Sequence, residues 1–179
     1  VVISTNLLNF DVYNDLDWCV KNNITLNVSI DGPEKIHDKH RTNLNGKGSF
    51  QEVMYNLSSI KQKNDIYFRS NLNLLVTVSE LSCLLPIARF WESNEVVCTK
   101  EPFSISGVSN NFDANTQYNE DELLNTLYEL MDYYEHHRHN LFIKSYFEIL
   151  TSPIIDRPIF DLEESSSALC CLPYNPRCF

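Results

Sequence analysis

The order of its apolar segments is the feature that most restricts how this chain can fold. Strand-like and helix-like segments alternate over the first hundred residues. The strand-like runs are 1–5, 24–30, 68–79 and 103–108. The helix-like runs between them are 9–22, 49–63 and 80–93. Such alternation predicts βαβ units, and therefore an α/β fold with parallel strands.

The side-chain pattern within the strand-like runs refines this prediction. In residues 24–30, Leu26, Val28 and Ile30 share one face, and polar residues occupy the other. Residues 68–79 repeat the pattern. Strands covered by helices on both faces, or filling a closed barrel, should instead be almost continuously apolar. We therefore expect part of an incomplete (β/α)6 TIM-like barrel whose polar inner face holds a ligand. Edge strands with one solvent-exposed face are the alternative.

Composition changes along the chain suggest three segments. Residues 1–110 form the predicted barrel portion, and 111–164 hold a polar loop, two helical stretches and a linker with Pro153 and Pro158. Residues 165–179 are the start of a cysteine-rich region. The chain begins with an apolar run and stops where cysteines have begun to cluster, so we expect it to be part of a longer polypeptide.

Charge and glycine content exclude several classes of function. The net charge is -10, which disfavours a general nucleic-acid or anionic-membrane surface, because neutralising phosphates needs an excess of Lys and Arg. No apolar run approaches the roughly 20 residues of a membrane helix, and no signal-peptide pattern is present. Only four glycines occur, and none forms a GxGxxG or Walker phosphate loop.

The six cysteines are too unevenly spaced to resemble a secreted disulfide framework, so we expect a cytoplasmic protein. For three of them, Cys19, Cys83 and Cys98, we expect buried apolar packing. The other three lie within the last ten residues and are typical of the edge of a metal or cluster site; they are Cys170, Cys171 and Cys178.

The segment "SIDGPEKIHDKHR", residues 29–41, carries the strongest chemical signal. Ser29 and Asp31 end a predicted strand, where α/β folds bind ligands. Gly32 and Pro33 then turn the chain, and Arg41 returns on a short helix or loop. A serine hydroxyl suits ribose or carboxylate oxygens, and an arginine fork recognises a carboxylate. An ion pair of Arg41 with Asp31 or Asp38 that only fixes the loop explains the spacing equally well.

The longer run "SIDGPEKIHDKHRTNLNGKGSFQEVMYNL" resembles radical S-adenosylmethionine enzymes of the SPASM group, which include peptide maturases and anaerobic sulfatase maturases. The matching positions are Ser29, Asp31, Gly32, Pro33, Ile36, His37, Asp38, Arg41, Asn45, Gly46, Gly48, Ser49 and Phe50. "ISTN" at 3–6 resembles the end of the preceding strand in that family, although Leu7 stands where the family usually has glycine. The resemblance is convincing over the first hundred residues.

The C-terminal "CLP" at 171–173 resembles the opening of a SPASM region, in which cysteines bind auxiliary iron-sulfur clusters. Tyr174 departs from the glycine common there, and zinc is the competing interpretation of Cys170, Cys171 and Cys178. The family's CxxxCxxC loop, which holds the [4Fe-4S] cluster that reduces S-adenosylmethionine, and its Gly-Gly-Glu-Pro stretch do not occur in this sequence. Both are expected upstream of Val1.

The resemblance implies that Ser29 and Arg41 contact S-adenosylmethionine, with Asn6 on a neighbouring strand end, and that Asp31 orients the loop. It further implies that the whole enzyme takes an electron from an external donor, cleaves S-adenosylmethionine to a 5'-deoxyadenosyl radical, and removes hydrogen from a peptide or protein substrate for post-translational modification. The protein's share of this chemistry is positioning and the exclusion of water.

Two groups of histidines could also take part in binding or catalysis. We expect structural roles for His37 and His40. His136 and His139 lie one turn apart and could bind a metal, but a solvated helix end is the favoured interpretation. A barrel that binds a peptide without catalysis, and a zinc-binding interaction module, are the alternatives to the radical enzyme.

Overall fold

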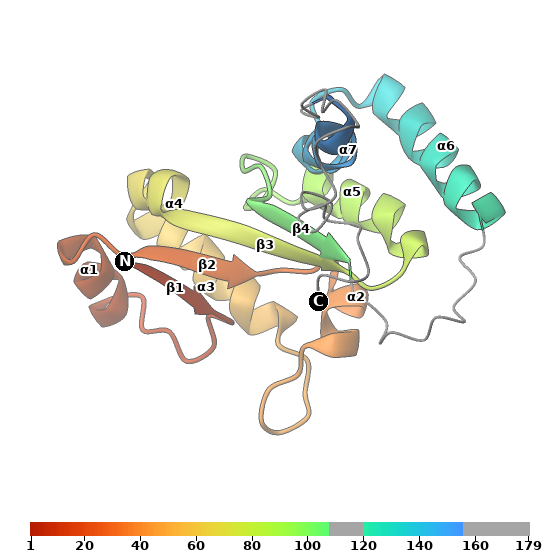
Figure 1. Cartoon of the computed structure of the whole chain (residues 1–179). Coiled ribbons are helices and arrows are strands. Elements are labelled where there is room, and N and C mark those ends of the chain that lie inside the picture. Colours follow the sequence, from red (N-terminus) through yellow and green to blue (C-terminus); the bar gives the residue numbers. More distant parts are fainter. Residues whose placement is uncertain (108–119, 156–179) are drawn as a thin grey trace, which may run out of the picture. The chain divides into compact units, whose positions relative to one another are not determined.

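The computed structural model of this chain describes residues 1–107 and 120–155 (Figure 1). The strands are β1 (Val2–Thr5), β2 (Thr25–Ser29), β3 (Leu72–Val78) and β4 (Ser104–Gly107). The helices are α1 (Asn14–Lys21), α2 (Glu34–His40), α3 (Phe50–Lys63), α4 (Asp65–Asn71), the 3-10 turn η1 (Leu81–Cys83), α5 (Leu84–Ser93), α6 (Glu120–His136) and α7 (Leu141–Ile155). The predicted alternation of strands and helices is confirmed.

The strands form one parallel sheet in the order β1-β2-β3-β4. Thr5 pairs with Val28, Ser29 with Leu75, and Thr77 with Ser106, so the carboxyl ends of the strands meet at one edge of the sheet. Figure 1 shows α3 behind the strands, on the far side of the sheet in that view. An α/β architecture with four parallel strands is therefore established; closure into a partial barrel stays a prediction.

The two faces of β2 and β3 differ as their sequences predict. Leu26 and Val28 of β2, and Leu72, Leu74 and Val76 of β3, are buried. The residues between them are half-buried, and two of these, Asn27 and Asn73, pair by a side-chain hydrogen bond of 3.0 Å. Helices add further core residues, which include Leu16, Val53, Leu57, Ile60, Leu84, Ile87, Ala88 and Trp91.

Three local predictions need correction. The first helix begins at Asn14 rather than near Asn9, because Asn9 has a φ of 55° and the Asp11 carboxylate accepts hydrogen bonds from the Tyr13 and Asn14 N–H groups. β3 begins at Leu72 rather than at Phe68, because residues 65–71 form α4. Of the three cysteines expected in the core, Cys19 is buried, but Cys83 and Cys98 are only half-buried.

Contacts divide the chain into two units, Val1–Tyr146 and Phe147–Phe179. The first holds the sheet and most of the helices. The described part of the second, residues 147–155, continues α7, and there the Thr151 hydroxyl donates to the Phe147 carbonyl at 2.8 Å. In the part of the chain that the structure describes, no helix is both long enough and apolar enough to cross a membrane.

Candidate functional site

The candidate site begins where β2 ends. The Ile30 N–H donates to the Leu75 carbonyl at 2.9 Å and extends the pairing with β3 by one residue, and Asp31 follows. Gly32 then has a φ of 123°, and a Cβ at this position would lie 2.7 Å from Cγ1 of Ile87 on α5. Both the backbone conformation and the close approach of α5 therefore require glycine at this turn.

Asp31 is buried and binds residues from two other segments. Its carboxylate accepts two hydrogen bonds from the Arg41 guanidinium, at 2.5 Å from Nε and 3.1 Å from Nη2. It also accepts one from the backbone N–H of Thr77 at 3.0 Å, and Arg41 Nη2 donates to the Thr77 hydroxyl at 3.3 Å. The predicted pair of Asp31 and Arg41 thus exists, and it joins the ends of β2 and β3 to the segment after α2.

A second chain of hydrogen bonds holds the backbone of Arg41. The Asp31 N–H lies 3.3 Å from His37 Nδ1, so Nδ1 accepts and the ring proton belongs on Nε2. Nε2 then donates to the Ser49 hydroxyl at 3.0 Å, which donates to the Arg41 carbonyl at 2.9 Å. Burial lowers the pKa of His37, and the charge of Asp31 only partly opposes that effect. The neutral ring that this chain requires is therefore favoured.

We call Asp31, His37, Arg41, Ser49 and Thr77 the sheet-end cluster. Asp38 supports it from outside: its carboxylate accepts from the Phe50 N–H at 2.9 Å, at the start of α3. A Cβ on Gly48 would collide with that carboxylate at 1.9 Å. The sequence pair Ser49 and Glu52 suggests a reciprocal capping box, but Asp38 provides the cap instead. Ser49 is engaged with His37 and Arg41, and Glu52 accepts from the Asn9 N–H.

The remaining two predicted cofactor contacts lie on neighbouring strand ends. Ser29 is the last residue of β2 and half-buried on the polar face. Asn6 follows β1 and is exposed, and its side-chain oxygen accepts from the Leu8 N–H at 3.2 Å. Leu7 is fully buried with a φ of 58°, a conformation that glycine favours, so the chain keeps that backbone path with a leucine.

A hollow of about 220 Å³ lies beside the cluster, lined by Asp31, His40, Arg41, Thr77 and Ser79. A larger one, of about 740 Å³, lies between the loop after β1 and α3. We assign the candidate site to the smaller hollow, because buried charge and hydrogen-bond donors converge there at the carboxyl ends of the strands. Two residues of this hollow, Thr77 and Ser79, were not among the predicted site residues, and two predicted ones, Asn6 and Ser29, are not part of its lining.

The predicted metal ligands Cys170, Cys171 and Cys178 lie outside the described residues. Within those residues, Cys19, Cys83 and Cys98 are free cysteines. The prediction of a cluster or zinc site in residues 165–179 therefore stays a prediction.

A parallel α/β sheet with a polar cluster at the carboxyl ends of its strands is a ligand-binding architecture. No family model matches the chain. It is 33% identical over 67 residues to a cysteine-type anaerobic sulfatase-maturating enzyme of Clostridium novyi, and 32% identical over 85 residues to a serine-type anaerobic sulfatase-maturating enzyme of Bacteroides thetaiotaomicron. These matches cover 36% and 46% of this chain, but only 17% and 19% of those enzymes.

Solved structures give the same relationship at the level of the fold. Native anSMEcpe with bound AdoMet superposes with a TM-score of 0.60, and the same protein with bound AdoMet and the Kp18Cys peptide with 0.59. Each is 15% identical, and the match covers 89% of this chain and 44% of that one. Over part of its length, the chain is thus related to the anaerobic sulfatase-maturating enzymes of the radical SAM/SPASM group.

Proposed function

We propose that this chain is part of a radical S-adenosylmethionine enzyme that modifies a peptide or protein. The observation that supports it is the fixed Arg41 guanidinium at the carboxyl ends of β2 and β3. It lies in a chain related to sulfatase-maturating enzymes, and a solved relative is described with bound AdoMet and a peptide. On this proposal residues 1–110 are a barrel portion, 111–164 a helical segment and linker, and 165–179 the start of an auxiliary-cluster region.

Donors in the hollow and on the neighbouring strand ends suit the polar groups of S-adenosylmethionine. The amino-acid part of that cofactor carries a carboxylate, and its ribose carries hydroxyls. Arg41, held beside the ends of β2 and β3, offers donors of the kind that matches the carboxylate. The Ser29 hydroxyl and the Asn6 amide, at the ends of β2 and β1, offer donors of the kind that matches the hydroxyls. With its [4Fe-4S] cluster and an electron from an external donor, the cofactor supplies the radical chemistry that removes hydrogen from the substrate.

The residues of this chain bind and orient in this proposal. Asp31 and Thr77 hold the guanidinium of Arg41, while Ser49 holds its backbone carbonyl, so the residue is fixed at both ends. Such fixation reduces the entropy lost when a ligand binds. Cys170, Cys171 and Cys178 are the proposed ligands of an auxiliary iron-sulfur cluster.

The test uses the protein that carries this chain, purified and reconstituted without oxygen. We expect iron and acid-labile sulfide, and an electron paramagnetic resonance spectrum of a reduced cluster that changes when S-adenosylmethionine is added. Arg41→Lys keeps the charge but loses the planar fork, and Ser29→Ala removes a hydroxyl. Each of these two variants should weaken cofactor binding about tenfold or more. The control Ser70→Ala removes a hydroxyl from α4, next to the opposite end of β3, and should bind normally.

Each arm of this experiment has a contradicting result. A protein that binds no iron, or zinc in its place, would refute the catalytic proposal and leave a domain that binds a peptide without catalysis. A cluster that responds to S-adenosylmethionine equally in Arg41→Lys, Ser29→Ala and the parent would keep the enzyme class but refute the assigned residues.

A further inference from the structure

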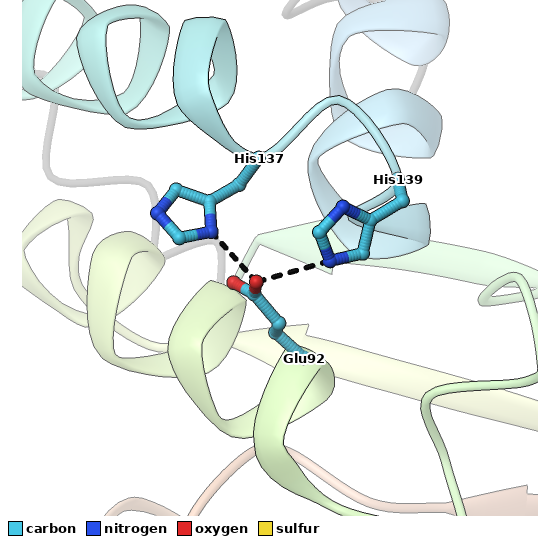
Figure 2. A group of neighbouring side chains, drawn as sticks. All are labelled: Glu92, His137 and His139. Carbon is cyan, nitrogen blue, oxygen red and sulfur yellow. Dashed lines mark hydrogen bonds and ion pairs between the residues drawn. The ribbon is translucent and has the colours of Figure 1, made fainter.

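A second polar cluster lies outside the proposed cofactor site. Glu92 extends from α5, and His137 and His139 belong to the turn between α6 and α7 (Figure 2). Glu92 Oε1 lies 2.6 Å from His137 Nδ1 and 3.0 Å from His139 Nε2. With Tyr133, whose hydroxyl donates to Glu92 Oε2, these residues form what we call the helix-turn cluster. We propose that this cluster binds one divalent transition-metal ion of the zinc class.

The spacing of the three ligand atoms suits such an ion. One atom from each of Glu92, His137 and His139 lies within 4.8 Å of the others. Zinc bonds of about 2.0–2.1 Å in tetrahedral geometry place ligand atoms roughly 3.3 Å apart. The observed separations of 2.6 and 3.0 Å from the carboxylate oxygen are therefore close to that value and slightly too short. Small outward movements admit the ion, and His139, whose side chain is 73% exposed, is free of close packing.

The two inner ligands are already held in position. The Tyr133 hydroxyl binds one carboxylate oxygen of Glu92 and leaves the other directed at the histidines. The Tyr133 ring also stacks on the His137 ring, with centroids 4.0 Å apart and planes 6° apart. One residue thus orients both a carboxylate and an imidazole, which is the function of outer-shell partners in metal sites.

The ligand types select the class of ion. Two imidazoles with one carboxylate suit zinc and similar transition metals, whereas Mg²⁺ and Ca²⁺ prefer sites made of oxygen atoms. Three protein ligands leave a fourth position for water. The bound ion would connect α5 to the turn after α6. The chain's net charge of -10 also favours the approach of cations.

The neighbouring histidine provides a matched control. Sequence spacing pairs His136 with His139, but the structure brings His137 and His139 to Glu92 instead. His136 Nδ1 lies 3.1 Å from the Asp132 carbonyl, in the last turn of α6. It is exposed, as the favoured interpretation of a solvated helix end expects. Replacing it changes the local histidine content without removing a proposed ligand.

The experiment titrates the full chain with Co²⁺, whose visible absorption reports tetrahedral coordination, and then displaces it with Zn²⁺. The unmodified chain is compared with a variant in which Cys170, Cys171 and Cys178 are serine. In that variant we expect one bound ion with absorption typical of nitrogen and oxygen ligands. In the same background, His139→Gln and Glu92→Gln should each weaken binding about tenfold or more, and His136→Gln should leave it unchanged.

Two results would overturn the proposal. One is a serine variant that binds no Co²⁺ at millimolar concentration, which would mean that any metal belongs to the cysteines. The other is equal affinity in His139→Gln, His136→Gln and the parent. If circular dichroism shows that Glu92→Gln does not fold, the affinity of His139→Gln for Co²⁺ tests the proposal alone, because the His139 side chain is largely exposed and its replacement should not affect folding. None of these measurements depends on S-adenosylmethionine or on enzymatic activity.

Discussion

The sheet-end cluster and the helix-turn cluster both combine a carboxylate with histidine, yet their surroundings give them different chemistry. In the first, His37 is fully buried, and each of its ring nitrogens has a protein partner. In the second, the His137 and His139 side chains are 35% and 73% exposed, and both are directed at the same carboxylate oxygen. A buried, fully paired histidine orders a loop, whereas exposed histidines that converge on one atom can exchange that contact for an ion.

The carboxylates differ in the same way. Asp31 accepts hydrogen bonds from a guanidinium and a backbone N–H, so both of its carboxylate oxygens have partners within the fold. Glu92 is held on one oxygen by Tyr133, and its other oxygen faces two titratable rings. Burial would raise the pKa of Glu92, but the hydrogen bonds from Tyr133 and His137, together with the charges of His137 and His139, outweigh it and lower that pKa. The pairing of a carboxylate, more than its charge alone, thus separates a structural site from a candidate binding site.

Removal of the buried carboxylate should give the largest effect. Asp31→Ala removes the carboxylate that accepts from Arg41 Nε and from the Thr77 N–H. Breaking a buried ion pair costs about 3–5 kcal/mol, but the Arg41 side chain is 30% exposed, and water can replace part of the contact. We expect the free energy of unfolding, measured in urea, to fall by about 2–3 kcal/mol.

A surface pair supplies the control for this prediction. Lys39 and Glu80 also form an ion pair, but both side chains are 54% exposed. Glu80→Ala should therefore leave the urea midpoint unchanged. Equal effects of Asp31→Ala and Glu80→Ala would mean that burial does not distinguish the two pairs, and the structural role of Asp31 would have to be abandoned.

The next effect concerns His37 and depends on pH. Burial lowers the pKa of His37 below its ordinary value of 6.5, so the unfolded chain takes up this proton more readily than the folded one. The stabilising contribution is therefore present above about pH 6.5 and is lost as pH falls toward the lower folded pKa. His37→Gln should lose about 1–2 kcal/mol near neutral pH and show a shallower decline toward about pH 5.

His40, three residues further along α2 and exposed, is the matched control. His40→Gln should retain the parent's dependence of urea stability on pH. A His37→Gln variant whose stability declines with pH as steeply as that of the parent would show that another group is responsible, and that the neutral His37 ring is not needed for the Ser49 and Arg41 contacts.

The sequence allows the sheet to be predicted well, because its signals are local. Period-two alternation in residues 24–30 is enough to assign a buried and a polar face, and Gly32 and Pro33 mark the turn after β2. Residues 68–71 show where local signals fail. They extend the strand-like run, but the Asn64 side chain accepts from the Tyr67 N–H, caps α4, and delays β3 to Leu72.

The contacts within both clusters depend on distant pairings that no local pattern contains. Thr77 joins Asp31 only because β3 lies beside β2, and Glu92 meets His137 across 45 positions of sequence. The capping box that the spacing of Ser49 and Glu52 suggests does not form, for a related reason. Its hydroxyl binds the Arg41 carbonyl, and Asp38, twelve positions before Phe50, takes over the cap. The residue types indicate which chemistry is available, but the tertiary structure determines which of these residues contact one another.

The smallest expected effect tests the helix-turn cluster without metal. Burial, followed by the hydrogen bond to Glu92, raises the pKa of Tyr133 to about 12, so its hydroxyl remains a donor at neutral pH. Tyr133→Phe should lower the free energy of unfolding by only about 0.5–1 kcal/mol, but it should raise the pKa of Glu92, as measured by carbon NMR of that carboxylate. Tyr128→Phe, at an exposed position of α6, should change neither quantity. An unchanged Glu92 pKa in Tyr133→Phe would mean that Tyr133 does not orient this carboxylate. The helix-turn cluster would then lack the fixed geometry that distinguishes a set of metal ligands from a surface ion pair.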